Sequence, residues 1–301
     1  MTRGVSIVGV PLDLGAGRRG VAMGPAALRL AEIQERLREL GYDIRDLGDV
    51  PVAHAAEPGD PRLKYLGEIR GACERLRELV RGAADEGRLP IVLGGDHSLA
   101  MGSIAGMSAH FRERGEKLGL IWFDAHADSN TAETSPSGNI HGMPLAVALG
   151  IGDPRLLALG GAVPMVAGEN AALVGIRDVD VAERANLKTA GIAALTMRDI
   201  DERGMAAVMR EAIERASRGT GGVHVSFDVD VIDPDLAKGT GTPARGGLTY
   251  REAHLAMELL ADTGKVVSAD FVEVNPALDN KNETARLAVE LVASLLGKRI
   301  L

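Results

Sequence analysis

The sequence predicts an α/β fold in which a mostly parallel sheet lies between two layers of helices. Short apolar, β-branched runs alternate with longer helical segments along the 301 residues, and this alternation is typical of parallel sheets covered on both faces. Hydrophobic residues make up 46% of the chain but aromatic residues only 3%, so the core must be mainly aliphatic, as in buried strands. No shift in composition marks a boundary. We therefore expect one three-layer α/β/α domain over residues 1–301.

Each strand is predicted from a short apolar run or, at residues 42–50, from alternating hydrophobicity. The predicted strands are residues 5–10, 42–50, 171–177, 192–197 and 266–274, with three more that begin at residues 89, 120 and 223.

The helices are predicted from their periodicity and from end signals. Pro25 suits a first helical turn and Gly41 a stop, while Thr249 and Glu252 match a capping box. The predicted helices are residues 25–40, 62–86, 99–114, 144–149, 154–159, 181–190, 201–218 and 283–296, with one more that ends at residue 262 after its Thr249 cap.

The charge balance excludes some partners. A net charge of −8 argues against binding to nucleic acid or to an anionic membrane. Cys73 is the single cysteine, so no internal disulfide can form, and a cytoplasmic location is favoured. Neither a signal peptide nor an apolar run of transmembrane length is present. We expect a cytoplasmic protein without nucleic-acid or membrane partners.

The most informative segment follows the apolar run at residues 120–123. Asp124, His126 and Asp128 are spaced two residues apart, so they would share one side if strand geometry continued. Two carboxylates and an imidazole crowded together repel or remain unpaired unless a cation joins them. The alternative is a strand that simply ends in a polar turn. We favour a divalent-cation site.

Two further segments place similar side chains after apolar runs. Asp228 and Asp230 follow one run, and Asp96 and His97 follow another. Ligands of open α/β sheets bind at the carboxyl ends of strands, so these distant segments are expected to meet in one crevice.

The charges favour two cations in that crevice, because four aspartates balance two divalent ions. Oxygen-rich ligation with two imidazoles favours Mn²⁺ over zinc, whose sites usually hold fewer and softer ligands. Water shared by two such ions ionises near neutral pH. The predicted metal ligands are His97, Asp124, His126, Asp128, Asp228 and Asp230.

Residues 15–20 match the G-x-G-x-x-G pattern of dinucleotide-binding proteins. That motif should turn directly from a strand into a helix, but here four residues precede it and the helix signal comes only at Pro25. Two arginines also occupy positions that should allow close approach of the cofactor. We expect a loop beside the crevice and no dinucleotide site.

The motifs GGDHS at 94–98, DAHAD at 124–128 and SFDVDVIDP at 226–234 resemble those of the ureohydrolase family of binuclear manganese hydrolases. Residues 130–144 and 271–276 are similar to its arginase branch, and the resemblance covers nearly the whole chain. It implies an eight-stranded sheet, two Mn²⁺ ions per subunit, and hydrolysis of L-arginine to L-ornithine and urea. It also implies a homo-oligomer, either a trimer or a hexamer.

The resemblance also implies roles for individual residues. His97 and Asp128 would bind one manganese ion, and His126 and Asp230 the other. The remaining roles implied by the family are bridging of both ions by Asp124 and Asp228, a proton shuttle at His141, a carboxylate facing the guanidinium at Glu273, and contacts to the amino-acid end of the substrate from Asn130, Ser137 and Asp180.

Four positions carry further inferences. Asp128 is our candidate to pass a proton to the leaving amine. His141 is alternatively a structural loop histidine, and Glu273 a surface acid. Ala22 departs from the family, because many relatives carry an acid there; this affects the early loop and leaves the metal site as predicted.

The substrate is predicted to be L-arginine, with agmatine or another guanidino compound as the alternative. Agmatine lacks the α-carboxylate, so an agmatine site would not need the donor-rich loop of Asn130, Thr134, Ser135 and Ser137. A different class also remains open, namely a non-catalytic protein that binds or assembles in a metal-dependent way.

Overall fold

A computed structural model describes residues 4–54 and 57–299. Its centre is an eight-stranded sheet with the strand order β2-β1-β3-β8-β7-β4-β5-β6, in which every neighbouring pair is parallel. The predicted parallel eight-stranded α/β fold is therefore confirmed. The strands are β1 (Gly4–Gly9), β2 (Asp43–Asp49), β3 (Leu89–Leu93), β4 (Lys117–Phe123), β5 (Ala171–Ile176), β6 (Ala193–Thr196), β7 (Thr220–Asp228) and β8 (Val266–Val272).

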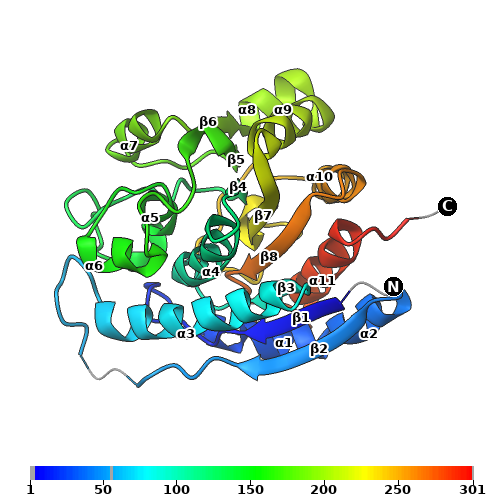
Figure 1. Cartoon of the computed structure of the whole chain (residues 1–301), viewed down its shortest axis with the longest axis horizontal. Coiled ribbons are helices and arrows are strands. Elements are labelled where there is room, and N and C mark those ends of the chain that lie inside the picture. Colours follow the sequence, from blue (N-terminus) through cyan, green and yellow to red (C-terminus); the bar gives the residue numbers. More distant parts are fainter. Residues whose placement is uncertain (1–3, 55–56, 300–301) are drawn as a thin grey trace.

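The sheet has a hydrophobic core on each face. In β4, Ile121 and Phe123 enter one core whereas Leu120 and Trp122 enter the other. Residues of α1, α2, α8, α9, α10 and α11 complete the first core, and residues of α3 to α7 complete the second. The result is a three-layer arrangement with the sheet in the middle (Figure 1).

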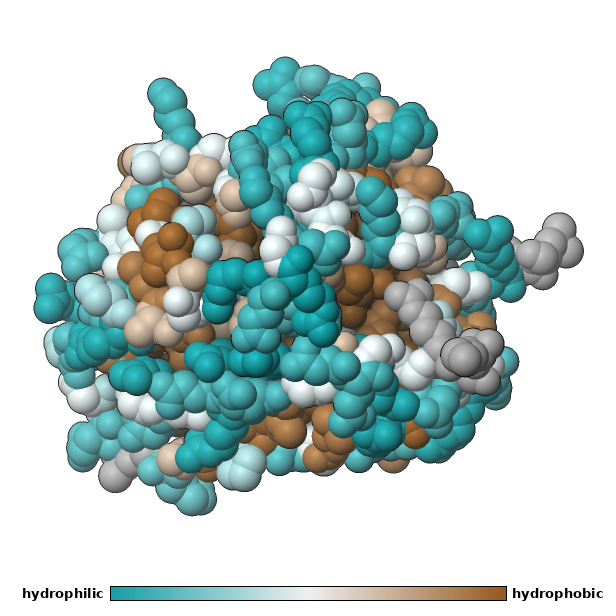
Figure 2. Space-filling view, in the orientation of Figure 1, coloured by the Kyte–Doolittle hydropathy of each residue, from teal (hydrophilic) through white to brown (hydrophobic). Residues whose placement is uncertain are grey.

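Most of the helices are amphipathic, and their outer faces make the surface polar, whereas α4 and α5 are buried on almost every side. The face shown in Figure 2 is mostly hydrophilic, with hydrophobic residues visible in separate areas between the charged side chains. The α-helices are α1 (Gly24–Leu30), α2 (Ile33–Glu39), α3 (Leu66–Asp85), α4 (Ala100–Arg112), α5 (Pro144–Ala148), α6 (Pro154–Leu157), α7 (Glu183–Ala190), α8 (Met197–Arg203), α9 (Met205–Ser217), α10 (Tyr250–Asp262) and α11 (Glu283–Leu295).

Two predicted helices are each divided in the structure. The helix expected at residues 25–40 breaks at Glu32, which adopts a left-handed conformation with φ of 65°. The helix expected at residues 201–218 begins earlier and breaks at Gly204, whose φ is 77°. Glycine reaches positive φ without steric cost, so this second break has a local cause. The capping box at Thr249 and Glu252 forms as predicted.

Four adjacent strands at the centre of the sheet, β3, β8, β7 and β4, position the site. Because all are parallel, their carboxyl ends meet at one edge. β4 ends at Phe123 and β8 at Val272, so the last strand is two residues shorter than predicted. The polar residues of interest therefore lie mostly in the turns that leave these strands.

None of the helices within residues 4–54 and 57–299 combines the length and apolarity needed to cross a bilayer.

Candidate active site

All six predicted ligands converge at the carboxyl ends of β3, β4 and β7. One group consists of His97, Asp124 and Asp228, and a second of Asp124, His126 and Asp230; within each group the candidate ligand atoms lie within 4.8 Å of one another. Asp124 belongs to both groups. Asp128 adjoins the first, since its Oδ2 lies 3.1 Å from Nδ1 of His97. The geometry is that of two adjacent sites with a shared carboxylate.

The backbone brings these residues together by tight turns, so the prediction of continued strand geometry is wrong. After β4, the carboxylate of Asp124 accepts a hydrogen bond of 2.7 Å from the backbone N–H of His126. Asp128 has a positive φ of 45°, which redirects the chain. After β7, Asp228 accepts a bond of 2.8 Å from the N–H of Asp230 within the 3₁₀ turn η6 (Val229–Val231). Side-chain-to-backbone bonds of this kind stabilise turns.

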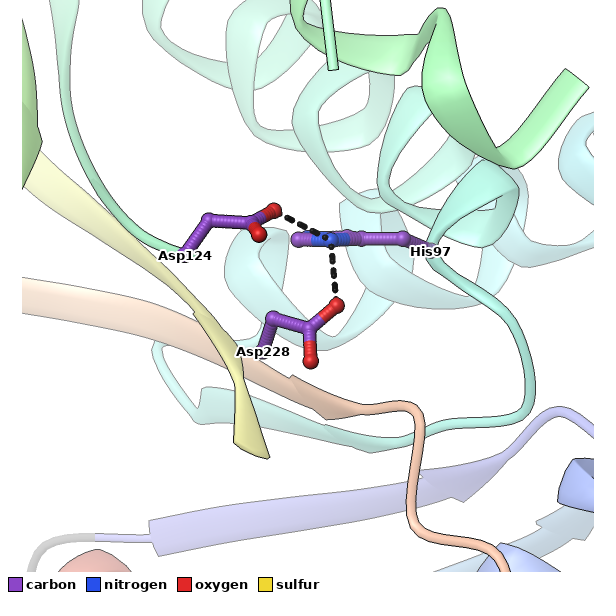
Figure 3. Close-up of side chains that lie close together, drawn as sticks. All are labelled: His97, Asp124 and Asp228. Atoms are coloured by element: carbon purple, nitrogen blue, oxygen red, sulfur yellow. Dashed lines mark ion pairs between the residues drawn. The ribbon is translucent and has the colours of Figure 1, made fainter. Parts of the chain in front are cut away.

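The surroundings of His97 fit a metal ion. Its Nδ1 lies 3.2, 3.1 and 3.2 Å from carboxylate oxygens of Asp124, Asp128 and Asp228, two of which point at the ring in Figure 3. Among the described residues this buried atom makes no hydrogen bond. In the metal-free chain burial lowers the pKa of His97, but these three carboxylates outweigh it and raise that pKa, which favours a hydrogen on this nitrogen; a bound metal ion would supply the same positive charge. Carboxylate and imidazole donors together suit a divalent ion such as Mn²⁺.

The second group has the same character. Nδ1 of His126 lies 3.0 Å from Oδ2 of Asp230 and 3.4 Å from Oδ1 of Asp124. The side chain of His126 is 27% exposed, whereas that of His97 is almost fully buried. The second site is therefore closer to solvent.

The carboxylates repel one another in a buried place. Burial and then the charge of Asp124 raise the pKa of Asp128 to about 7. Burial and neighbouring carboxylates also raise the pKa values of Asp228 and Asp230. For Asp124 burial acts in the same direction, but contacts with the two histidines outweigh it and lower the pKa. Bound divalent cations would remove this repulsion.

His141 and Glu273 form a pair beside the predicted ligands. Oε1 of Glu273 lies 3.0 Å from Nδ1 of His141 and accepts a bond of 3.0 Å from the backbone N–H of His97. Burial lowers the pKa of His141, but the hydrogen bond and charge of Glu273 outweigh it and raise that pKa to about 9. Glu273 is 1% exposed, so the interpretation as a surface acid is wrong.

The residues expected to recognise the amino-acid end of the substrate line a cavity of about 190 Å³ next to the predicted ligands. Asn130, Ser137 and Asp180 share its wall with His126, Asp128 and His141. A wider outer cavity of about 580 Å³ adjoins it and includes Gly17 and Arg18 of the early glycine-rich loop. That loop does not turn directly into a helix, because the 3₁₀ turn η1 (Val21–Met23) separates it from α1.

The sequence analysis missed several polar residues of this cavity. Glu183, 4% exposed, accepts hydrogen bonds of 2.9 Å from the backbone N–H groups of both Ser129 and Asp180. The Oγ1 of Thr242 donates a bond of 3.1 Å to Asp230. Asp178 also lines both cavities. The hydrogen-bond partner of the Thr242 hydroxyl could not be predicted from the sequence, because it depends on how the loop folds back onto Asp230.

The chain is similar to known arginases along its length. The family model described as Arginase family matches residues 3–297. The arginase of Bacillus caldovelox is 51% identical over 300 residues, 99% of each chain, and its solved structure has a TM-score of 0.95 over 100% of both chains. Entamoeba histolytica arginase, solved in complex with L-ornithine, has a TM-score of 0.90 at 32% identity, covering 99% of this chain and 100% of that one. A hypothetical agmatinase from Burkholderia thailandensis is more distant, with a TM-score of 0.74 and 28% identity, covering 98% of this chain and 85% of that one.

Proposed function

Because the chain belongs to the arginase family, we infer that it is an arginase, a hydrolase that converts L-arginine to L-ornithine and urea. The observation that carries the inference is the convergence of two overlapping groups of buried aspartates and histidines beside a polar cavity. Two relatives that are 51% and 50% identical to it over nearly their whole length are arginases. This chemistry requires a strong nucleophile, because a guanidinium is a stabilised cation and a poor electrophile.

The family is metal-dependent, and we propose two Mn²⁺ ions per chain. His97 and Asp128 would hold one ion and His126 and Asp230 the other, while Asp124 and Asp228 would contact both. The unbonded Nδ1 of His97 and the position of Asp124 in both groups support this assignment. When bound, the ions supply Lewis acidity and a water molecule ionised near neutral pH.

The chain's own residues would orient the substrate and move protons. Glu273 lines the outer cavity and has one oxygen without a hydrogen bond to the described residues, which suits a charge-assisted bond to the guanidinium. Asp128 would take the proton of the attacking water on its carboxylate and pass it to the leaving amine, a role that fits a carboxylate in the wall of the cavity beside the predicted ligands. His141 would exchange protons between the cavity and solvent.

The cavity favours L-arginine over agmatine. Asn130 and Ser137 offer an amide and a hydroxyl to an α-carboxylate, and Asp180 offers a carboxylate to the α-ammonium. Agmatine has no α-carboxylate to accept hydrogen bonds from those donors, so it forgoes bonds that arginine can make.

The assembly and the cellular setting are further proposals. We propose that the whole chain works as one domain and assembles into a homo-oligomer, a trimer or a hexamer, in the cytoplasm, where it acts in arginine metabolism such as a urea cycle. Light scattering of the purified protein tests the assembly.

Urea release from L-arginine and agmatine, with Mn²⁺ present and after chelation, tests the function. We expect release from arginine that is lost on chelation and restored by Mn²⁺. A preference for agmatine would establish the alternative ureohydrolase activity. A manganese-loaded protein that binds arginine without releasing urea would instead be a non-catalytic binding protein.

A further inference from the structure

A chain of buried hydrogen bonds extends from His97 away from the predicted metal ligands. Nε2 of His97 lies 2.8 Å from Oγ of Ser226, and that hydroxyl donates a bond of 2.5 Å to Oδ1 of Asp270. Ser226 on β7 and Asp270 on β8 are direct register partners. All three residues are at most 1% exposed. Asp270 is not among the residues to which the proposed function gives a role.

The protons of this chain can be assigned by counting donors. Asp270 receives hydrogen bonds from three groups, since Oγ of Ser103 lies 2.5 Å and Nε2 of His224 lies 3.0 Å from its Oδ2. A serine hydroxyl has a single hydrogen. Because Ser226 donates that hydrogen to Asp270, it can only accept from His97. Nε2 of His97 must therefore carry a hydrogen, which leaves Nδ1 as the ring nitrogen available to bind a metal ion.

We propose that Asp270 is a positioning residue that, through Ser226, holds His97 in the tautomer whose Nδ1 lone pair faces the predicted metal site. The inference rests on the proposed role of His97 as a metal ligand. Asp270 itself does not touch substrate or metal. A hydrogen bond to the second ring nitrogen is a general way to fix a metal-binding histidine.

The orientation of the His97 ring is fixed as well as its tautomer. Trp122 stacks on it with ring centroids 4.1 Å apart and planes inclined by 14°. The indole Nε1 of Trp122 donates a bond of 3.0 Å to Asp124. A rotation of the ring out of its plane would lose the stacking contact, and a flip within that plane would lose the bond to Ser226.

The second histidine lacks this support. Within the described part of the chain, Nε2 of His126 has no hydrogen-bond partner, and the side chain is partly exposed. The loss of the hydrogen-bond chain should therefore weaken one of the two proposed ions and spare the other. A general loss of stability would not discriminate between the two sites.

The decisive variant is Asp270→Asn. Its amide can donate to Ser226, and the serine hydroxyl would then donate to Nε2 of His97, which moves the ring hydrogen to Nδ1. Ser226→Ala removes the link without reversing it. Ser103→Ala is the matched control, because it removes another donor to the same carboxylate and leaves the His97 end intact.

Mn²⁺ binding is measured by calorimetry on the metal-stripped full chain, with electron paramagnetic resonance of the loaded protein as a second readout. We expect Asp270→Asn to bind one ion per chain, with the spin-coupled signal of a manganese pair replaced by that of an isolated ion. Ser226→Ala should bind the ion at His97 about 10 to 100 times less tightly than the wild type does. Ser103→Ala should bind both ions.

Each other outcome overturns the inference. If folded Asp270→Asn binds both ions as tightly as the wild type does, the inference is wrong. It is also wrong if Ser103→Ala loses as much Mn²⁺ affinity as Asp270→Asn, because Asp270 would then have a structural role. If Asp270→Asn does not fold, Ser226→Thr and Ser226→Ala decide, since only Thr keeps the hydroxyl; equal affinities contradict the proposal. If the wild type itself never binds a second ion, the two-metal site of the proposed function has failed instead.

Discussion

The side-chain amide of Asn130 donates a hydrogen bond of 3.0 Å to the carboxylate of Asp180, which lies 50 residues later in the chain. One residue is a donor suited to an α-carboxylate and the other an acceptor suited to an α-ammonium. The backbone segments that carry them are also joined, because Glu183 accepts hydrogen bonds from Ser129 and Asp180. The two ends of the predicted amino-acid subsite are thus held in a fixed relation.

Replacement of Asn130 by Ala should separate the two candidate substrates. We expect KM for L-arginine to rise about 10-fold or more, because the α-carboxylate loses a hydrogen-bond donor worth about 1.5 kcal/mol or more, while KM for agmatine changes little. Asp180→Asn is the matched variant and should raise KM for both substrates, since both carry an ammonium group. Steady-state urea assays check this, and equal effects of Asn130→Ala on the two substrates would contradict the assignment.

The pH dependence of the metal-free protein should depend on the His141–Glu273 pair. The pKa of His141 in the folded chain, about 9, lies above its ordinary value of 6.5. The stabilisation by this pair is therefore complete below about pH 6.5 and is lost as the pH rises through 9. In Glu273→Gln the pKa should fall, because burial then acts without the opposing carboxylate.

Two measurements on the metal-free protein check this. Urea denaturation of the wild type should show a free energy of unfolding that falls between about pH 6.5 and 9. In Glu273→Gln the pair is absent, so its contribution to this fall should be lost. Acylation of His141 by diethyl pyrocarbonate, followed by mass spectrometry, should begin at a lower pH in the variant. An unchanged acylation profile would show that Glu273 does not set this pKa.

Gly95 should not tolerate a side chain. A Cβ atom added there would lie 1.8 Å from the backbone oxygen of Leu12, so β3 and the early loop would have to separate. We expect Gly95→Ala to cost about 3 kcal/mol or more. The control is Gly82→Ala on the exposed side of α3, where an added Cβ would meet no described atom within 4 Å apart from its chain neighbours and the helix's own backbone, and a gain of about 0.5–1 kcal/mol is expected. Urea denaturation of both variants measures the difference, and a stable Gly95→Ala protein would show that the loop can yield.

Arg177 should stabilise the loop that carries Thr242. Its guanidinium donates to backbone carbonyls of β5, of η6 and of the loop. Lysine cannot reproduce this planar set of donors, so Arg177→Lys should cost about 2–4 kcal/mol by leaving buried acceptors unpaired. The acceptors are the carbonyl groups of Gly175, Asp230, Val231, Ala244 and Arg245.

The control for this variant is Arg198→Lys on α8. The side chain of Arg198 is 84% exposed and, among residues 4–54 and 57–299, is paired only with Glu202; exposed pairs contribute little. Urea denaturation should show no change for Arg198→Lys. A similar result for Arg177→Lys would mean that water replaces the lost donors.

The sequence was sufficient to predict the fold class, all eight strands and the segments that meet at the site, because apolar runs and their polar ends are local patterns. The way in which Asp124, His126 and Asp128 converge was not predictable from spacing. Their arrangement depends on a backbone bond to Asp124 and on the positive φ of Asp128, which alternation of residue types does not encode. Helix breaks such as Glu32 were missed for the same reason.

Residues that only position other residues could not be predicted from the sequence either. Asp270 lies within an apolar strand, and its sequence position does not reveal a partner. Its role follows only from its register with Ser226. Glu183 begins a charged helix, α7, and nothing local distinguishes it from a solvated acid. Its pKa is raised by burial, which follows only from tertiary packing.

The strand order has a consequence for biosynthesis. β7 and β8 are the last strands to be translated, yet they lie between β3 and β4. Before they emerge from the ribosome, the β2-β1-β3 and β4-β5-β6 halves have no backbone ladder in common, and Asp228 and Asp230 do not yet exist to complete either ligand group. A nascent chain therefore cannot complete either group of candidate ligands until the final pair of strands has been translated.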